Sequence, residues 1–174
     1  MVIILISTAI ALALLVGGAA LVKNARVDRP VSMFLAANPD VLEYRIEAGN
    51  TETLISIELA PVANVQESYE TLEAQIREIM KDRPYRIVLK DNRNQRLDAA
   101  YYELHFSLRE AAATGHFVTM AEEMRSRCED LQLTDVRVYV GEENLYLDAR
   151  DGEHYLYAVM PRQDAAVLKR GEKA

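Results

Sequence analysis

Cysteine is almost missing from this sequence, because Cys128 is the one example among 174 residues. No disulfide can form within the chain, and no cysteine-rich metal cluster can be built. Histidine is also scarce. His105, His116 and His154 show neither of the short spacings at which two histidines on one element share a metal ion. We therefore expect no metal site and no cofactor.

Glycine is sparse too, with seven examples and no cluster beyond Gly17 and Gly18. The sequence has no glycine-rich phosphate loop, no GxSxG nucleophile elbow and no HExxH zinc motif. Cys128 lies on an apolar helical stripe with Met124 and Leu131, which favours a buried thiol over a nucleophile. Because no catalytic constellation is present, we expect a protein that is not an enzyme.

Basic residues are outnumbered: 20 lysines and arginines stand against 27 acidic residues, and the net charge is −7. No basic stripe with interleaved aromatic residues occurs. Phosphate backbones repel a chain of this charge, so nucleic-acid binding is disfavoured.

Charged side chains are missing altogether from residues 2–22, a run whose most polar members are Ser7 and Thr8. About 20 apolar residues cross the hydrocarbon core of a bilayer as a helix. The run therefore predicts a transmembrane helix and a single-pass protein of the cell membrane. The alternative is a cleaved signal peptide, which the lack of a basic N-terminal region disfavours.

The orientation of this helix follows from its flanks. Lys23, Arg26 and Arg29 come directly after the run, and no charged side chain precedes it. Basic residues beside a span tend to remain in the cytoplasm. We therefore expect the rest of the chain to face the cytoplasm.

Small residues recur inside the run, with Ala9, Ala13 and Gly17 at every fourth position. This spacing places them on one helix face, where a second helix can approach closely. The stripe predicts packing of the span against another membrane helix. Because alanine is abundant in the run, chance is the alternative explanation.

Three further segments follow the span. Residues 23–40 are expected to be a juxtamembrane connector that ends in the turn residues Asn38-Pro39-Asp40. Residues 41–162 are expected to form one soluble domain. Residues 163–174 are expected to be a flexible tail, because they contain too few apolar side chains to pack.

The domain begins with a strand, helix and strand pattern. Apolar residues alternate with polar ones over 42–46 and 55–59, which predicts a β-hairpin. Apolar residues then recur every three or four positions over 65–79, which predicts a helix capped by Asn64. Alternation returns over 85–89 and predicts another strand.

The same order then repeats. Alternation over 100–108 predicts a strand, helical spacing over 117–131 predicts a helix, and alternation over 136–140 predicts a strand. Residues 97–113 also fit a helical stripe, so this segment has two interpretations. We favour the strand, because the repeat then closes and the preceding strand gains a partner.

Two such units joined end to end predict an α+β fold of the ferredoxin-like type. This split βαβ arrangement has a four-stranded antiparallel sheet with both helices on one face. Here it would carry an added N-terminal strand and a C-terminal hairpin that turns at Asp151-Gly152.

Tyrosines gather on the predicted strands. Exposed tyrosines on an open sheet face would provide contact area for a partner or a second copy. Packing against the added hairpin is the alternative. The candidate partner-binding residues are Tyr101, Tyr139, Tyr146, Tyr155 and Tyr157.

These observations together predict a membrane-anchored, non-catalytic interaction or scaffold domain that faces the cytoplasm. It would contact the bilayer through residues 2–22 and associate with itself or with a membrane complex. The alternative is a membrane-tethered regulatory module that binds a small ligand, because tandem βαβ units also serve in that way. Fold alone does not decide between them.

Overall fold

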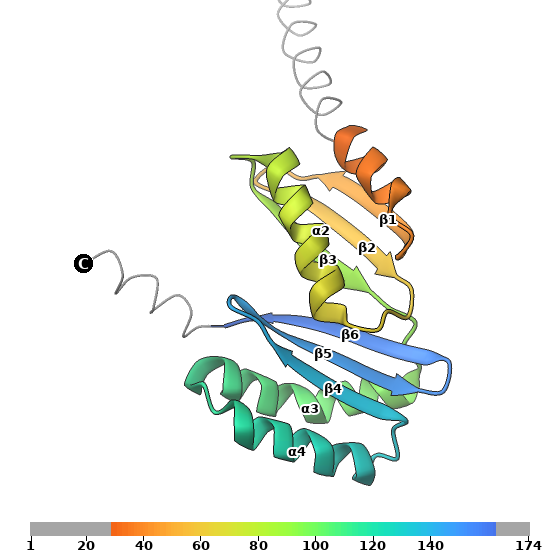
Figure 1. The fold of residues 1–174 in the computed structure, drawn as a ribbon, viewed down its shortest axis with the longest axis vertical. Coiled ribbons are helices and arrows are strands. Elements are labelled where there is room, and N and C mark those ends of the chain that lie inside the picture. Colours follow the sequence, from red (N-terminus) through yellow and green to blue (C-terminus); the bar gives the residue numbers. More distant parts are fainter. Residues whose placement is uncertain (1–28, 163–174) are drawn as a thin grey trace, which may run out of the picture.

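The computed structural model describes residues 29–162, which are drawn in colour in Figure 1. The predicted span at 2–22, with its stripe of Ala9, Ala13 and Gly17, lies outside these residues, and so does the tail at 163–174. Across the described range, no helix is both long enough and apolar enough to cross a membrane. This range has an α+β fold, as predicted, with four helices and two three-stranded sheets.

The first sheet, sheet A, consists of β1 (Val41–Ala48), β2 (Thr53–Leu59) and β3 (Tyr85–Lys90). β1 and β2 form the predicted antiparallel hairpin, and β3 lies parallel to β2. The crossover between β2 and β3 contains α2 (Val65–Met80), whose first N–H groups donate to the Asn64 side chain. The predicted hairpin, helix, cap and strand are therefore confirmed.

Part of the expected connector is helical. Residues 29–37 form a helix, and its Val31 and Leu35 are buried in the same core as α2 and sheet A. Asn38 follows, and its side-chain oxygen accepts a hydrogen bond from the Asp40 N–H at 2.9 Å, as expected of a turn. The packed domain therefore includes residues before 41.

The second sheet, sheet B, is an antiparallel meander of β4 (Asp135–Val140), β5 (Asn144–Asp151) and β6 (His154–Pro161). The predicted C-terminal hairpin is β5 and β6, and Gly152 at its turn has a φ of +63°, which side chains rarely adopt. The predicted second helix is α4 (Phe117–Asp130), which precedes β4.

The preference for a strand over residues 100–108 is wrong. This segment belongs to α3 (Gln95–Thr114), which Asn94 caps by accepting a hydrogen bond from the Leu97 N–H at 3.0 Å. Gly115 ends the helix in the left-handed conformation. The buried residues of α3 follow the helical stripe of the competing interpretation, which its alanines also favour. They are Leu97, Ala100, Leu104, Leu108, Ala111 and Ala112.

The ferredoxin-like prediction is wrong for the same reason. A split βαβ fold needs a fourth strand beside β3 in one continuous sheet, and α3 occupies the sequence that would supply it. Without that strand the sheet divides in two. α2 then packs on sheet A, while α3 and α4 pack on sheet B.

Sheet B lies between two layers (Figure 1). One face packs against α3 and α4 through residues such as Leu147 and Leu156. The other face turns toward α2 and sheet A, and there Tyr155 and Tyr157 enter the first core. Because side chains alternate along a strand, β5 and β6 contribute to both cores.

Substitutions in α3 distinguish its helical face from a strand face. A strand would put Leu104 and Phe106 on one buried side, whereas in α3 Leu104 is 1% exposed and Phe106 is 57% exposed. We expect Leu104→Ala to lower the free energy of unfolding by about 2–5 kcal/mol. Phe106→Ala should change it by less than about 0.5 kcal/mol. Denaturant unfolding of the chain measures both, and equal losses would contradict this packing.

Candidate functional site

Two tyrosines of β6 bond the segment that follows β2. The Tyr155 hydroxyl donates to the Leu59 carbonyl at 2.6 Å. The Tyr157 hydroxyl accepts from the Val62 N–H at 2.9 Å and donates to the Ala60 carbonyl at 3.3 Å. Sheet B is thus hydrogen-bonded to the end of sheet A across nearly 100 residues of sequence.

An ion pair between a buried carboxylate and a partly exposed guanidinium completes this contact. Arg150 donates to both carboxylate oxygens of Asp148, at 3.0 and 2.9 Å, and Asp148 is 1% exposed. The same guanidinium donates to the Val62 carbonyl at 2.6 Å. We call Asp148, Arg150, Tyr155 and Tyr157, with residues 59–62, the sheet junction. Its polar groups bond one another, so its role is structural.

Asp91 attaches the start of α3 to the same region. Its carboxylate accepts the Tyr157 N–H at 2.8 Å and two bonds from the Arg93 guanidinium, each 2.7 Å long. Nearby, the Asn94 side chain donates to Asp151 at 2.9 Å. These bonds fix the direction in which α3 leaves sheet A.

Three of the five predicted partner-binding tyrosines are internal. Tyr146, Tyr155 and Tyr157 are between 1% and 3% exposed, and the Tyr146 hydroxyl donates to Glu70 of α2 at 3.2 Å. The exposure expected for them is not found, because sheet A and α2 cover their face of sheet B. That covering joins residues distant in the sequence, so strand alternation could not reveal it.

The other two tyrosines are partly buried. Tyr101 lies under the guanidinium of Arg93, whose central carbon is 5.5 Å from the ring centre. The Tyr139 hydroxyl donates to the Ala63 carbonyl at 3.4 Å. A partner-binding role for these two residues stays a prediction.

The aromatic side chains that are exposed lie on α3 instead. Tyr102 is 65% exposed and Phe106 is 57% exposed, and their rings meet edge to face with centres 5.7 Å apart. His105 lies between these two residues in the sequence, and the centre of its ring is 3.9 Å from the centre of the Phe106 ring. We call Tyr102, His105 and Phe106 the α3 aromatic patch. A helical assignment of this segment would have identified it from the sequence.

Carboxylates border this patch. A hollow of about 600 Å³ between α3 and α4 is lined by Phe106 and by three acidic residues, Glu110, Glu123 and Asp130. None of these three forms an ion pair within residues 29–162. Arg127 also lines the hollow, and its guanidinium lies 3.7 Å from the carboxylate of Glu103. The surface therefore combines exposed aromatic rings with negative charge.

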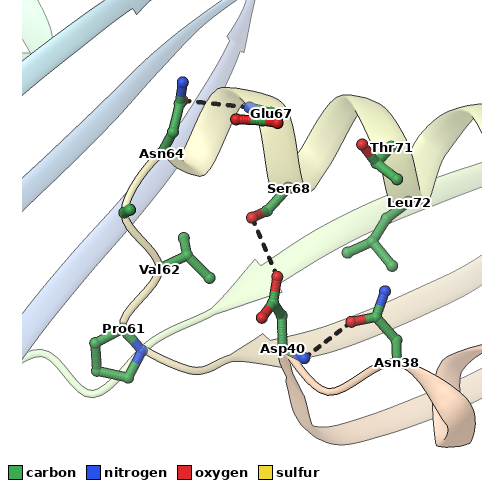
Figure 2. Close-up of a pocket in the computed structure, with 10 residues that line it drawn as sticks. Asn38, Asp40, Pro61, Val62, Asn64, Glu67, Ser68, Thr71 and Leu72 are labelled. Atoms are coloured by element: carbon green, nitrogen blue, oxygen red, sulfur yellow. Dashed lines mark hydrogen bonds between the residues drawn. The ribbon is translucent and has the colours of Figure 1, made fainter.

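A second hollow lies at the start of α2, and Figure 2 shows its lining. It has a volume of about 440 Å³, within the range of small-ligand sites. The Ser68 hydroxyl points to Asp40 and donates to its carboxylate at 3.4 Å, and Glu67 lies one residue earlier on α2. With two carboxylates and no basic side chain in its lining, this hollow suits neutral or cationic polar groups.

Nothing among the described residues supports a metal site or a reactive thiol. No group of three histidine, cysteine, aspartate or glutamate side chains between residues 29 and 162 could hold a metal ion. Burial raises the pKa of the Cys128 thiol, and the carboxylates of Asp135 and Glu129 raise it further. A raised pKa favours the neutral thiol, whereas a nucleophilic cysteine needs the thiolate.

Comparisons with known proteins identify no relative. No protein-family model matches the chain, and no curated protein or solved structure matches it. Any functional assignment therefore depends on the residues of this chain.

Alkaline titration tests the burial of the tyrosines. Desolvation raises the pKa of Tyr146 and of Tyr157 from 10 to about 12. The unfolded chain releases these protons near pH 10, so the stability that they contribute is complete below pH 10 and is lost as pH rises through about 12.

Burial also raises the pKa of Tyr69 and of Tyr155 above 10, so we expect the ultraviolet absorbance of four phenolates to appear only as circular dichroism reports unfolding above pH 10. Tyr146→Phe and Tyr157→Phe should each remove one of these late titrations. Ionisation of both tyrosines near pH 10 in the folded chain would show that they are accessible to water.

Proposed function

We propose that this chain is a membrane-tethered, non-catalytic interaction protein whose folded domain faces the cytoplasm and binds a protein partner through the α3 aromatic patch. The exposure of Tyr102 and Phe106 carries the proposal. The apolar run at 2–22 and the basic residues after it support the tether and its orientation.

The composition of the patch supports a protein partner. Aromatic side chains provide large, rigid contact area, and they are enriched among the residues that dominate binding energy. The opposite side of α3 is held by Leu104 and Leu108, each 1% exposed, so the patch is presented on a fixed helix. A fixed surface loses little conformational freedom when a partner binds.

The neighbouring carboxylates indicate the chemistry of the partner. Glu110, Glu123 and Asp130 favour a segment that carries lysine or arginine beside an apolar side chain. An arginine of such a segment can also stack on the ring of Phe106 or Tyr102.

The position of the patch also agrees with a tether. Residue 29, where the described chain begins, belongs to the helix that packs on sheet A, and α3 lies on the far side of sheet B (Figure 1). A bilayer near residue 29 would leave α3 and α4 open to the cytoplasm.

Photo-crosslinking in cells tests this function. Benzoylphenylalanine in place of Tyr102 or Phe106 should produce a discrete crosslinked product with another protein. The matched control is Leu42, which is 60% exposed on β1, and it should give no such product. In the chain with the probe at 102, Phe106→Ala should lower the yield about tenfold, as expected for the loss of one dominant contact of about 1.4 kcal/mol. No product at 102 and 106, or the same products at 42, would contradict the proposal.

The hollow at the start of α2 favours a second candidate function, a regulatory module that binds a small polar ligand. Thermal unfolding of the full chain against panels of amino acids, nucleotides and divalent cations separates the two functions. We expect no change in the midpoint. A saturable rise that Asp40→Asn abolishes and the distant Asp130→Asn keeps would favour ligand binding instead.

A further inference from the structure

Within residues 29–162, sheet A is covered on one face only. Side chains alternate along a strand, so Ile55, Ile57 and their neighbours in β1 and β3 point to α2, and the residues between them point the other way. We call this second side the outer face of sheet A. Its three columns are Glu43, Arg45 and Glu47 of β1, Leu54, Ser56 and Glu58 of β2, and Arg86, Val88 and Lys90 of β3.

The columns of β1 and β3 are exposed and carry most of the charge of this face. All of their residues are exposed, including Val88 at 38%. Along β1 the order is acidic, basic, acidic, and along β3 this valine lies between two basic residues. Arg86 pairs with Glu52, just before β2, at 2.9 Å. The other charged side chains of the face form no ion pair in the described part of the chain.

We propose that two copies of this chain pack the outer faces of sheet A against each other, about a two-fold axis that runs along the strands. β1 of one copy then lies over β3 of its partner, and β3 lies over the partner's β1. Sheets stacked in this way are aligned to within about 30° and lie about 10 Å apart. The surface is separate from the α3 aromatic patch, and the inference does not depend on that patch.

The charges of the two outer columns complement each other in this dimer. The strand registers give three rows, namely Glu43 with Lys90, Arg45 with Val88, and Glu47 with Arg86. The axis keeps the rows and exchanges the columns. Glu43 therefore faces the partner's Lys90, and Glu47 faces the partner's Arg86. The remaining charge of β1, on Arg45, faces an uncharged residue, so both charged contacts are attractive and each occurs twice.

The column of β2 lies beside the axis and faces its own copy. Leu54 and Ser56 are uncharged there. Glu58 faces the partner's Glu58, but Lys90 is its neighbour in the sheet and offsets the repulsion. Glu52 has its own partner in Arg86. The acidic groups nearest the axis therefore each have a cation beside them.

The opposite stacking brings like charges together. A two-fold axis across the strands would place β1 over the partner's β1 with the rows reversed. Glu43 would then face Glu47, Arg45 would face the partner's Arg45, and Lys90 would face Arg86. Every one of these contacts is repulsive, and like charges placed together oppose association. The charge pattern therefore selects the axis along the strands.

The selected axis also agrees with two copies tethered to one membrane. The helix at 29–37 packs on sheet A and runs back along β1, where the Ser32 and Tyr44 hydroxyls bond at 2.8 Å (Figure 1). An axis along the strands puts residue 29 of both copies at the same end of the dimer. An axis across the strands would put the two at opposite ends. Both predicted spans can therefore enter the same bilayer.

Exchange of charge between two tagged chains tests the proposal. Light scattering of the purified full chain should show a dimer. Glu43→Lys and Lys90→Glu each oppose like charges twice, and each should raise the dimer dissociation constant about tenfold. In a mixed dimer of the two variants, opposite charges face each other again at both places. The mixture should therefore regain the original dissociation constant and yield dimers that contain both tags.

The matched control is Glu122→Lys, the same change of charge at an exposed position of α4, which should leave the dissociation constant unchanged. Circular dichroism checks that each variant is folded. A monomeric full chain would overturn the proposal. So would a dimer that Glu43→Lys and Lys90→Glu leave intact, because it would form elsewhere on the chain, and so would a mixture that stays monomeric.

A thiol crosslinker tests the direction of the axis. Two differently tagged chains, both with Cys128→Ala, carry Arg45→Cys and Val88→Cys respectively, and a bismaleimide spans the distance of about 10 Å between stacked sheets. Arg45→Cys chains should link to Val88→Cys chains and not to one another. Links among Arg45→Cys chains alone would show the opposite stacking and overturn the proposed axis.

Discussion

The guanidinium of Arg150 joins the two sheets, because it bonds Asp148 on its own strand and the Val62 carbonyl beyond β2. Asp148 is 1% exposed, so removing Arg150 would leave a buried carboxylate without its partner, a loss of about 3–5 kcal/mol in typical cases. Tyr155 and Tyr157 add their own bonds to the same segment. Without these contacts, the tyrosine face of sheet B would meet water, and α2 would lose part of its core.

The packing of the two sheets decides which surfaces stay uncovered. One face of sheet B is used to hold sheet A, and the other is covered by α3 and α4. The outer side of α3 and the outer face of sheet A remain. The first offers aromatic rings beside carboxylates, and the second offers a charge pattern that complements itself.

Local patterns in the sequence predicted most of the elements. The hairpin of β1 and β2, the Asn64 cap, α4 and the Asp151-Gly152 turn each depend on neighbouring residues, and each is present. Residues 97–113 fit two periods, and the helix is favoured by the Asn94 cap, the alanines and Gly115 as well as by the packing of Leu104 and Leu108 on sheet B. The sheet junction and the burial of Tyr157 depend on contacts across nearly 100 residues, which no local pattern records. The α3 aromatic patch was not predicted from the sequence, because its residues come together only when residues 97–113 form a helix.

The side of the membrane that the domain occupies decides which partners can reach it. A tag placed after Ala174, with protease added to intact and to lysed cells, measures this directly. The account predicts that the tag is protected until the cells are lysed and that the chain stays with the membrane fraction. Digestion in intact cells, or release of the chain from the membrane at high pH, would contradict a cytoplasm-facing, membrane-tethered interaction protein.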